Sequence, residues 1–340
     1  MTTLINIYST LGAPPAPDFP HALLGSRGHG EPALAGHLNG FGGYVRNRSE
    51  TMTQTLYHVL LHIERTRNQF SMNVEDADLA ALAHWARRAN GILFTPDGAV
   101  RDSEGRILVG ANGESDPAAQ VPYPADAAER KARTNATLTA SGVPTARSLP
   151  PLISAEEVQL RTPSEVALRS LGLFIPCVRA ESLNENDPLP IAELRNRCPV
   201  GFEGLTPAER HFLFAASPIK QDIINFAWRY EALAVLQWAL RLSDSLPWPS
   251  QICDVPQAAR GALDNNTKAF VQSATLRPAA EILDALDLHY RLHWAVTEAR
   301  VQRQAPPANV NASVVKERHH ALNWLVRFQN SDWDDVDTPT

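Results

Sequence analysis

Residues 223–242, IINFAWRYEALAVLQWALRL, are apolar on nearly every side of a helix, and they decide how the C-terminal part of the chain folds. A helix that is apolar all round belongs in a protein interior. We therefore expect a helix over residues 219–242 at the centre of a helical domain. Arg229 and Glu231 lie in its middle. Residues two positions apart on a helix point about 200° apart, so these two side chains cannot pair well with each other.

A buried charge without a partner costs several kcal/mol, so each of these charges needs a partner from another segment or a bound ligand. A second predicted helix, over residues 278–303, offers partners. Its Asp287 and Arg291 are four apart, the spacing of an ion pair along one face. We predict a buried polar network that contains Arg229, Glu231, Asp284, Asp287, Arg291 and Arg318. The network either fastens helices together or lines a polar pocket.

His289 and His293 share one helix face at the spacing that can hold zinc. The zinc-protease pattern also needs Glu directly after the first His, to act as general base. Tyr290 stands there instead, so the sequence predicts no metal site and no cofactor. His293 stays a candidate proton donor or acceptor.

The remaining segments predict an α+β fold, with a small N-terminal α/β domain followed by a larger, mainly α-helical domain. Residues 1–110 alternate between strand and helix patterns. The expected strands are 3–9, 37–47 and 68–74, and the expected helices are 53–66 and 76–90, the second closed by Gly91. Two turns, at Asp97-Gly98 and Glu104-Gly105, predict three short strands over 92–110.

Residues 111–150 are rich in Ala, Pro and Ser, and they predict a linker with one polar helix near 125–141. Residues 151–340 form the predicted helical domain, with a last helix over 313–328. Three capping boxes mark helix starts, because a hydroxyl is followed three residues later by a Glu that can reach back. They are Ser154 with Glu157, Thr162 with Glu165, and Thr206 with Glu209.

Composition excludes several classes of protein. The net charge of −6 over 340 residues argues against nonspecific nucleic-acid binding, which needs a cationic face. The three cysteines show no C-x-x-C spacing, so neither a zinc ribbon nor a disulfide framework is supported. The chain shows neither a signal-peptide pattern nor about 18 consecutive apolar residues. We expect a cytoplasmic protein that does not enter a membrane.

The last eight residues, WDDVDTPT, combine one Trp with three acids. Asp335-x-Asp337 resembles half of a phosphotransferase motif, but Pro339 stands where that motif needs Thr or Val. A calcium loop fails too, because Val336 occupies a ligand position. We expect a docked tail, in which Trp333 fills a groove on the helical domain. Asp334 and Asp335 would then meet arginines or helix N-termini.

Several of these strings together resemble a family known as domain of unknown function 4272. They are NFAWRYEAL, LRPAAEILDALDLHYRLHWA, ERHHALNWL and WDDVDTPT, and the resemblance covers roughly residues 128–340. The matching landmarks are Trp228, Arg229, Tyr230, Glu231, Asp284, Asp287, Arg291, His293, Trp294, Arg318, Asn323, Trp324, Trp333, Asp334 and Asp335. The resemblance implies a bacterial protein with a helical domain and without an established activity.

We interpret the chain as a binding protein without catalytic turnover, of an accessory or immunity type, that recognises a protein partner. Its oligomeric state stays open. The binding candidates are Arg229, Tyr230, Arg291, Trp294, Arg318, Asp334 and Asp335. The alternative is an enzyme that acts on a small anionic substrate. Its catalytic candidates are Glu231, Asp284, Asp287 and His293.

Overall fold

The structure is a computed structural model that describes residues 1–340. The chain divides into two units. The first consists of residues 1–129 and 150–157, and the second of residues 130–149 and 158–340. A small antiparallel sheet with helices precedes a larger helical region, so the predicted α+β class is confirmed. None of the helices combines the length and the apolar character that a bilayer crossing requires.

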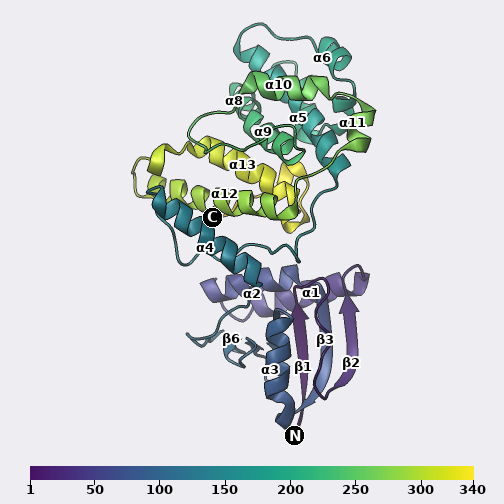
Figure 1. Cartoon of the computed structure of the whole chain (residues 1–340), viewed down its shortest axis with the longest axis vertical. Coiled ribbons are helices and arrows are strands. Elements are labelled where there is room, and N and C mark those ends of the chain that lie inside the picture. The colour runs from purple at the N-terminus through teal and green to yellow at the C-terminus, as the bar shows by residue number, and fades with distance from the viewer. The chain divides into compact units, whose positions relative to one another are not determined.

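A six-stranded antiparallel sheet forms the centre of the first unit (Figure 1), in the order β2-β3-β1-β4-β5-β6. The strands are β1 (Thr2–Ser9), β2 (Ala22–Gly28), β3 (Asn68–Glu75), β4 (Gly91–Phe94), β5 (Val100–Arg101) and β6 (Ile107–Val109). Its helices are α1 (Pro32–Arg46), α2 (Gln54–Arg65), the 3-10 turn η1 (Asp76–Asp78) and α3 (Leu79–Arg88).

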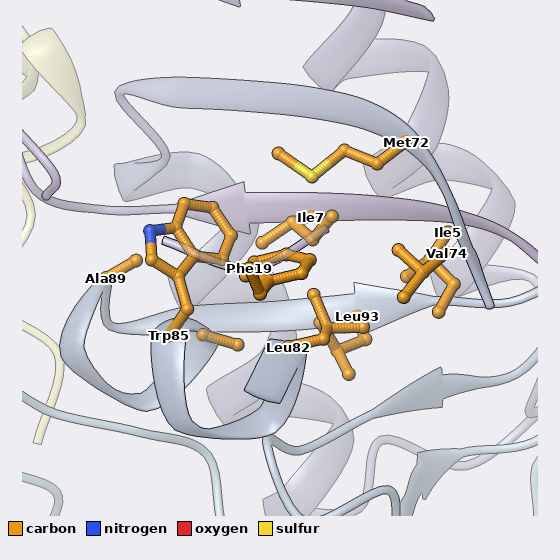
Figure 2. Close-up of a cluster of buried hydrophobic side chains, with 10 residues drawn as sticks. Ile5, Ile7, Phe19, Met72, Val74, Leu82, Trp85, Ala89 and Leu93 are labelled. Atoms are coloured by element: carbon orange, nitrogen blue, oxygen red, sulfur yellow. The ribbon is translucent and has the colours of Figure 1, made fainter. Parts of the chain in front are cut away.

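Apolar side chains cover both faces of this sheet, because successive strand residues point to opposite sides. On one face, Ile5 and Ile7 of β1 belong to the same buried apolar cluster as Trp85 of α3, and Phe19 lies beside Trp85 in it (Figure 2). On the other face, Tyr8 packs with Phe41 of α1 and with residues of α2. The sheet therefore lies between α3 and the α1–α2 pair.

One prediction for this unit is wrong, and one strand was not predicted. Residues 37–46 belong to α1 rather than to a strand, and Asn47 follows the end of this helix. Pro32 suits a first helical turn, and Leu34, Phe41 and Val45 are the buried residues of this helix. Packing on the sheet thus outweighs the low helix propensity of four glycines. Strand β2 was not predicted, because its seven residues are mostly exposed and lack a periodic apolar pattern.

The end of α3 also differs from the expectation. Asn90, not Gly91, has the left-handed backbone conformation, with φ of 47°. Gly91 begins β4 instead, and a Cβ atom there would lie 2.9 Å from a methyl group of Ile7. Glycine at this position therefore permits close approach between β4 and β1 rather than a helix end.

The second unit consists of helices and short 3-10 turns. They are α4 (Ala125–Ala140, most of which belongs to this unit), α5 (Pro163–Asn184), α6 (Ile191–Arg197), η2 (Val200–Gly204), α7 (Pro207–Phe214), α8 (Lys220–Trp228), α9 (Tyr230–Ala239), α10 (Val255–Asp264), α11 (Lys268–Ser273), α12 (Ala279–Val301), η3 (Pro307–Asn309), α13 (Ala312–Leu325), η4 (Phe328–Asn330) and η5 (Trp333–Asp335). Helix α13 packs against both α12 and α9, and α5 packs against α8 and α9 (Figure 1).

Two of the three predicted capping boxes begin helices. Thr162 opens α5 and Thr206 opens α7, each with reciprocal bonds to its Glu. The Ser154–Glu157 pair makes the same two hydrogen bonds, at 2.7 and 3.2 Å, but residues 155–157 form only a turn and no helix starts there. The two hydrogen bonds of a capping box are therefore not enough to form a helix. The residues that follow must also pack against the rest of the protein.

The single helix expected over residues 219–242 is interrupted at Arg229, which separates α8 from α9. The N–H of Arg229 bonds to the carbonyl of Phe226, three residues back instead of four. Nearly all of α9 is buried, as expected for an apolar helix. No residue of α8 is fully buried, although Ile223, Ile224 and Trp228 lie on it.

Candidate functional site

Glu231, in the first turn of α9, has a buried carboxylate whose two oxygens are both occupied. Oε2 accepts from Nε of Arg318 in α13 at 3.0 Å, and Oε1 accepts from the backbone N–H of Cys253. Nη1 of Arg318 also donates to the carbonyl of Pro247, at 2.6 Å. The two side chains are only 2% and 1% exposed. This is a buried ion pair, as the network hypothesis expected for these two residues.

Arg229 does not reach the helix at 279–301 that was expected to supply its partner. Its Nη1 donates to Oε2 of Glu317 in α13, at 2.9 Å. Burial raises the pKa of Glu317, and the positive charge of Arg229 opposes that rise. Glu317 was not among the predicted residues, although the sequence places it directly before Arg318.

Asp287 and Arg291 form the expected pair along α12. The guanidinium of Arg291 forms a bidentate ion pair with the carboxylate of Asp287. Nη2 donates to Oδ1 at 2.8 Å, and Nε donates to Oδ2 at 3.0 Å. Both side chains are buried. Asp284 is half exposed instead, and it accepts from Arg130 and Arg133 of α4 at 3.1 and 3.2 Å. The structure thus divides the expected network into separate ion pairs, of which Asp287–Arg291 lies within α12 and the others link different helices.

Four histidines, His289, His293, His319 and His320, lie where α12 meets α13 and the tail. Nδ1 of His293 and Nδ1 of His319 are 3.0 Å apart, and Nδ1 of His289 lies 2.8 Å from the carbonyl oxygen of Ala285. Burial lowers the pKa of both His289 and His293 to about 4. His293 is therefore neutral near pH 7. The chain contains no group of three or more His, Cys, Asp or Glu side chains that could hold a metal ion.

The C-terminal tail lies on the second unit. Trp333 is 5% exposed, and its ring meets those of Trp324 and His320 edge-on, with centroids 5.3 and 4.8 Å away. The Arg169 guanidinium carbon lies 5.1 Å from the Trp333 ring centroid. Oδ2 of Asp334 accepts from the N–H of Ala208 in the first turn of α7, at 3.0 Å. This carboxylate therefore meets a helix N-terminus, whereas the side chain of Asp335 is exposed.

Tyr230 and Trp294, the two aromatic binding candidates, lie in different surroundings. The hydroxyl of Tyr230 donates to Oε2 of Glu181 at 2.7 Å, and burial raises the pKa of this tyrosine. Trp294 packs against the apolar cluster around Leu138 and Leu292. Of the two, only Tyr230 lies beside Glu231.

The break between α8 and α9 lies beside a partly open pocket of about 160 Å³. Its walls are formed by Ala227, Trp228, Tyr230, Glu231, Ile252, Cys253 and Val255. Burial, and then the negative charge of Glu231, raise the pKa of the Cys253 thiol to about 12. The thiol is therefore protonated at neutral pH and is not a nucleophile. Most of the lining is apolar, so the pocket suits an apolar group.

Sequence reasoning missed one buried ion pair near the tail. Nη2 of Arg169 in α5 lies 2.6 and 2.7 Å from the two carboxylate oxygens of Glu209 in α7, and both side chains are buried. The signal was the same as for Arg229, a single charge inside an apolar helical run. Glu209 was assigned only as a capping residue, yet it serves both the cap and the pair.

Comparison with known proteins identifies the family. The model of the family described as domain of unknown function (DUF4272) matches residues 130–336. No curated protein and no solved structure is similar enough to this chain to count as a match. The match spans more than half of the chain and includes α5, the Glu231–Arg318 pair and Trp333. The chain therefore belongs to the DUF4272 family.

Proposed function

We propose that this protein is a binding protein without catalytic turnover, and that its second unit docks an apolar segment of a protein partner. The contact surface is the α8 face, defined as Ile219, Ile223, Ile224, Ala227, Trp228 and Ile252. The observation that carries the proposal is that α8 holds five apolar residues and buries none of them fully. Ile219 and Ile252 are 62% and 60% exposed. The other four members of the face are half-buried, and exposed apolar surface of this kind is characteristic of interaction sites.

The pocket at the α8–α9 break supplies an anchor point within this face. Its volume of about 160 Å³ is close to that of a cavity of ~150 Å³ that accommodates benzene. Sites for whole small-molecule ligands are larger, roughly 300–1,000 Å³. The pocket therefore fits one aromatic side chain of a partner, with the surrounding face covering its neighbours. Such an aromatic anchor in a pocket is the usual centre of a protein interface.

The buried charges support binding rather than chemistry. Glu231 and Asp287 each use both carboxylate oxygens in hydrogen bonds, and neither opens onto a polar cleft. His293 has its pKa lowered by burial, far below neutrality. A general base needs a free lone pair within reach of substrate. Glu231 instead links α9 to α13 through Arg318, directly after the break that ends α8.

The test is selection of binding peptides with the full-length chain. A random peptide library is panned against the wild type, and enriched peptides are then measured with two variants. Ile219→Ser/Ile252→Ser removes two exposed apolar residues from the α8 face. Val301→Ser is the matched control, because Val301 is 70% exposed at the end of α12.

We expect enriched peptides to carry an aromatic residue among apolar ones. They should bind the Val301→Ser variant like the wild type and lose at least tenfold in affinity to the double variant. Circular dichroism should show the same fold in all three proteins. Failure to enrich any peptide, or enrichment of peptides that bind the double variant equally well, would contradict the proposal.

A further inference from the structure

The sheet of the first unit carries a row of polar side chains where an apolar surface is expected. Arg27 of β2 pairs with Gln69 of β3, which in turn pairs with Tyr8 of β1. Paired residues of adjacent strands point to the same face. Ser71 and Asn6 form the next pair along this face. Polar residues from three strands therefore meet on the side of the sheet where α1 packs.

Gln69 lies at the centre of this cluster and has no solvent-exposed surface. Its Oε1 accepts from Nη1 of Arg27 at 2.5 Å. Its Nε2 donates to Oδ1 of Asn6 at 3.2 Å and to Oγ of Ser71 at 2.9 Å. Ser71 donates in turn to Oδ1 of Asn6, at 2.6 Å. A buried amide thus holds Arg27 in one orientation over the sheet.

The side-chain oxygens of Gln69, Asn6 and Ser71 all take part in these hydrogen bonds. The groups still available to a ligand are therefore hydrogen-bond donors. Arg27 makes no ion pair, and Gln69 is its one side-chain partner. A guanidinium has five N–H donors in a fixed fork, so most of them are left over. The amide nitrogen of Asn6 adds two more. Side chains of both residues are partly exposed, so a ligand can reach them.

The side of the cluster that faces α1 is formed by a tyrosine and a histidine. The hydroxyl of Tyr8 lies 3.0 Å from Nε2 of His37, and their rings are parallel within 7°. Burial lowers the pKa of His37, and the positive charge of Arg27 lowers it further. His37 therefore reports on the charge near Arg27, because an anion bound there would offset that second effect.

We propose that this cluster, centred on Arg27 and Asn6, is a binding site for the carboxylate of a small organic acid. A carboxylate matches the planar fork of a guanidinium, which binds both oxygens at once. One uncompensated cation suits one negative charge. This site belongs to the first unit and is independent of the protein-binding function proposed for the second.

The experiment follows the imidazole signals of His37 by NMR in the full-length chain, labelled at histidine. The probes are sodium acetate and inorganic phosphate, each compared with sodium chloride at equal ionic strength. Arg27→Gln removes the cation, and Arg27→Lys keeps the charge but removes the fork. Arg46→Gln is the matched control, an exposed arginine at the end of α1 that makes no ion pair.

Acetate should shift the His37 signals saturably and raise the pKa of His37 in the wild type and in Arg46→Gln. Affinity should fall at least tenfold in Arg27→Gln and severalfold in Arg27→Lys. Absence of a saturable acetate effect, or an equal effect in Arg27→Gln, would overturn the proposal. A response to phosphate alone would show that the carboxylate assignment is wrong, and a response shared with chloride would indicate an adventitious ion only.

Discussion

Replacing Glu231 by Gln keeps the shape of a buried side chain but removes its charge, so Arg318 is left as a buried cation without a counter-ion. Both side chains are almost completely inaccessible to water. Breaking a buried pair by removing one partner costs about 3–5 kcal/mol. For a folding unit of about 200 residues, each kcal/mol lowers the melting temperature by roughly 2–4 °C, so we expect a decrease of roughly 6–20 °C.

Differential scanning calorimetry on four proteins tests this reasoning. They are the wild type, Glu231→Gln, the double variant Glu231→Gln/Arg318→Met, and Glu193→Gln as a control. The double variant removes both charges and should recover much of the loss, since an apolar replacement of a buried pair is often neutral. The Glu193–Arg197 pair is exposed, so its loss should cost about 0–1 kcal/mol. A melting temperature of Glu231→Gln within about 2 °C of the wild type would correspond to a loss of roughly 1 kcal/mol or less. That result would show that the Glu231–Arg318 ion pair does not stabilise the second unit as a buried pair should.

Three further predictions concern the tail and the histidines. Trp333→Ala should destabilise the second unit by about 3–5 kcal/mol, because a buried indole that packs on Trp324 is lost, and a lower urea midpoint would show it. Asp334→Ala should cost only about 0.3–1 kcal/mol in the same assay, because an exposed carboxylate at a helix N-terminus is weakly bound; a loss as large as that of Trp333→Ala would contradict this. His289 alone should contribute a loss of about 3 kcal/mol of stability as the pH drops from 6.5 to 4, since the unfolded chain protonates it first while burial lowers its folded-state pKa to about 4. His293, whose pKa is lowered in the same way, should add to the total. Urea unfolding at several pH values checks this, and the slope should be shallower in His289→Leu.

Features that depend on neighbouring residues were predicted well. The capping boxes at Thr162 and Thr206 form as expected, and Gly98 and Gly105 have the positive φ that their turns require. The pattern of β3 also matches its prediction. In each case, the hydrogen bonds or the alternation are made within a few residues of the chain, so the sequence contains all of the relevant information.

Features that depend on packing were not recoverable. The pattern of residues 37–47 indicated a strand, yet contact with the sheet makes this segment helical. The break at Arg229 has no breaking residue to announce it, because neither Pro nor Gly lies nearby. The pocket beside that break, with its wall at Ile252, was therefore outside the reach of pattern reasoning.

The charged residues show which features the sequence determines and which depend on tertiary structure. The apolar run of residues 223–242, with Arg229 and Glu231 inside it, indicates by sequence alone that each charge needs a counter-ion, because a charge among apolar residues loses its contact with water. Which residues supply it was decided only by tertiary structure. Arg318 lies 87 residues from Glu231, and the packing of α13 on α9 brings the two together. Hydrophobic patterning specifies that a helix is buried, whereas the side chains that meet across two helices depend on their relative rotation and crossing angle.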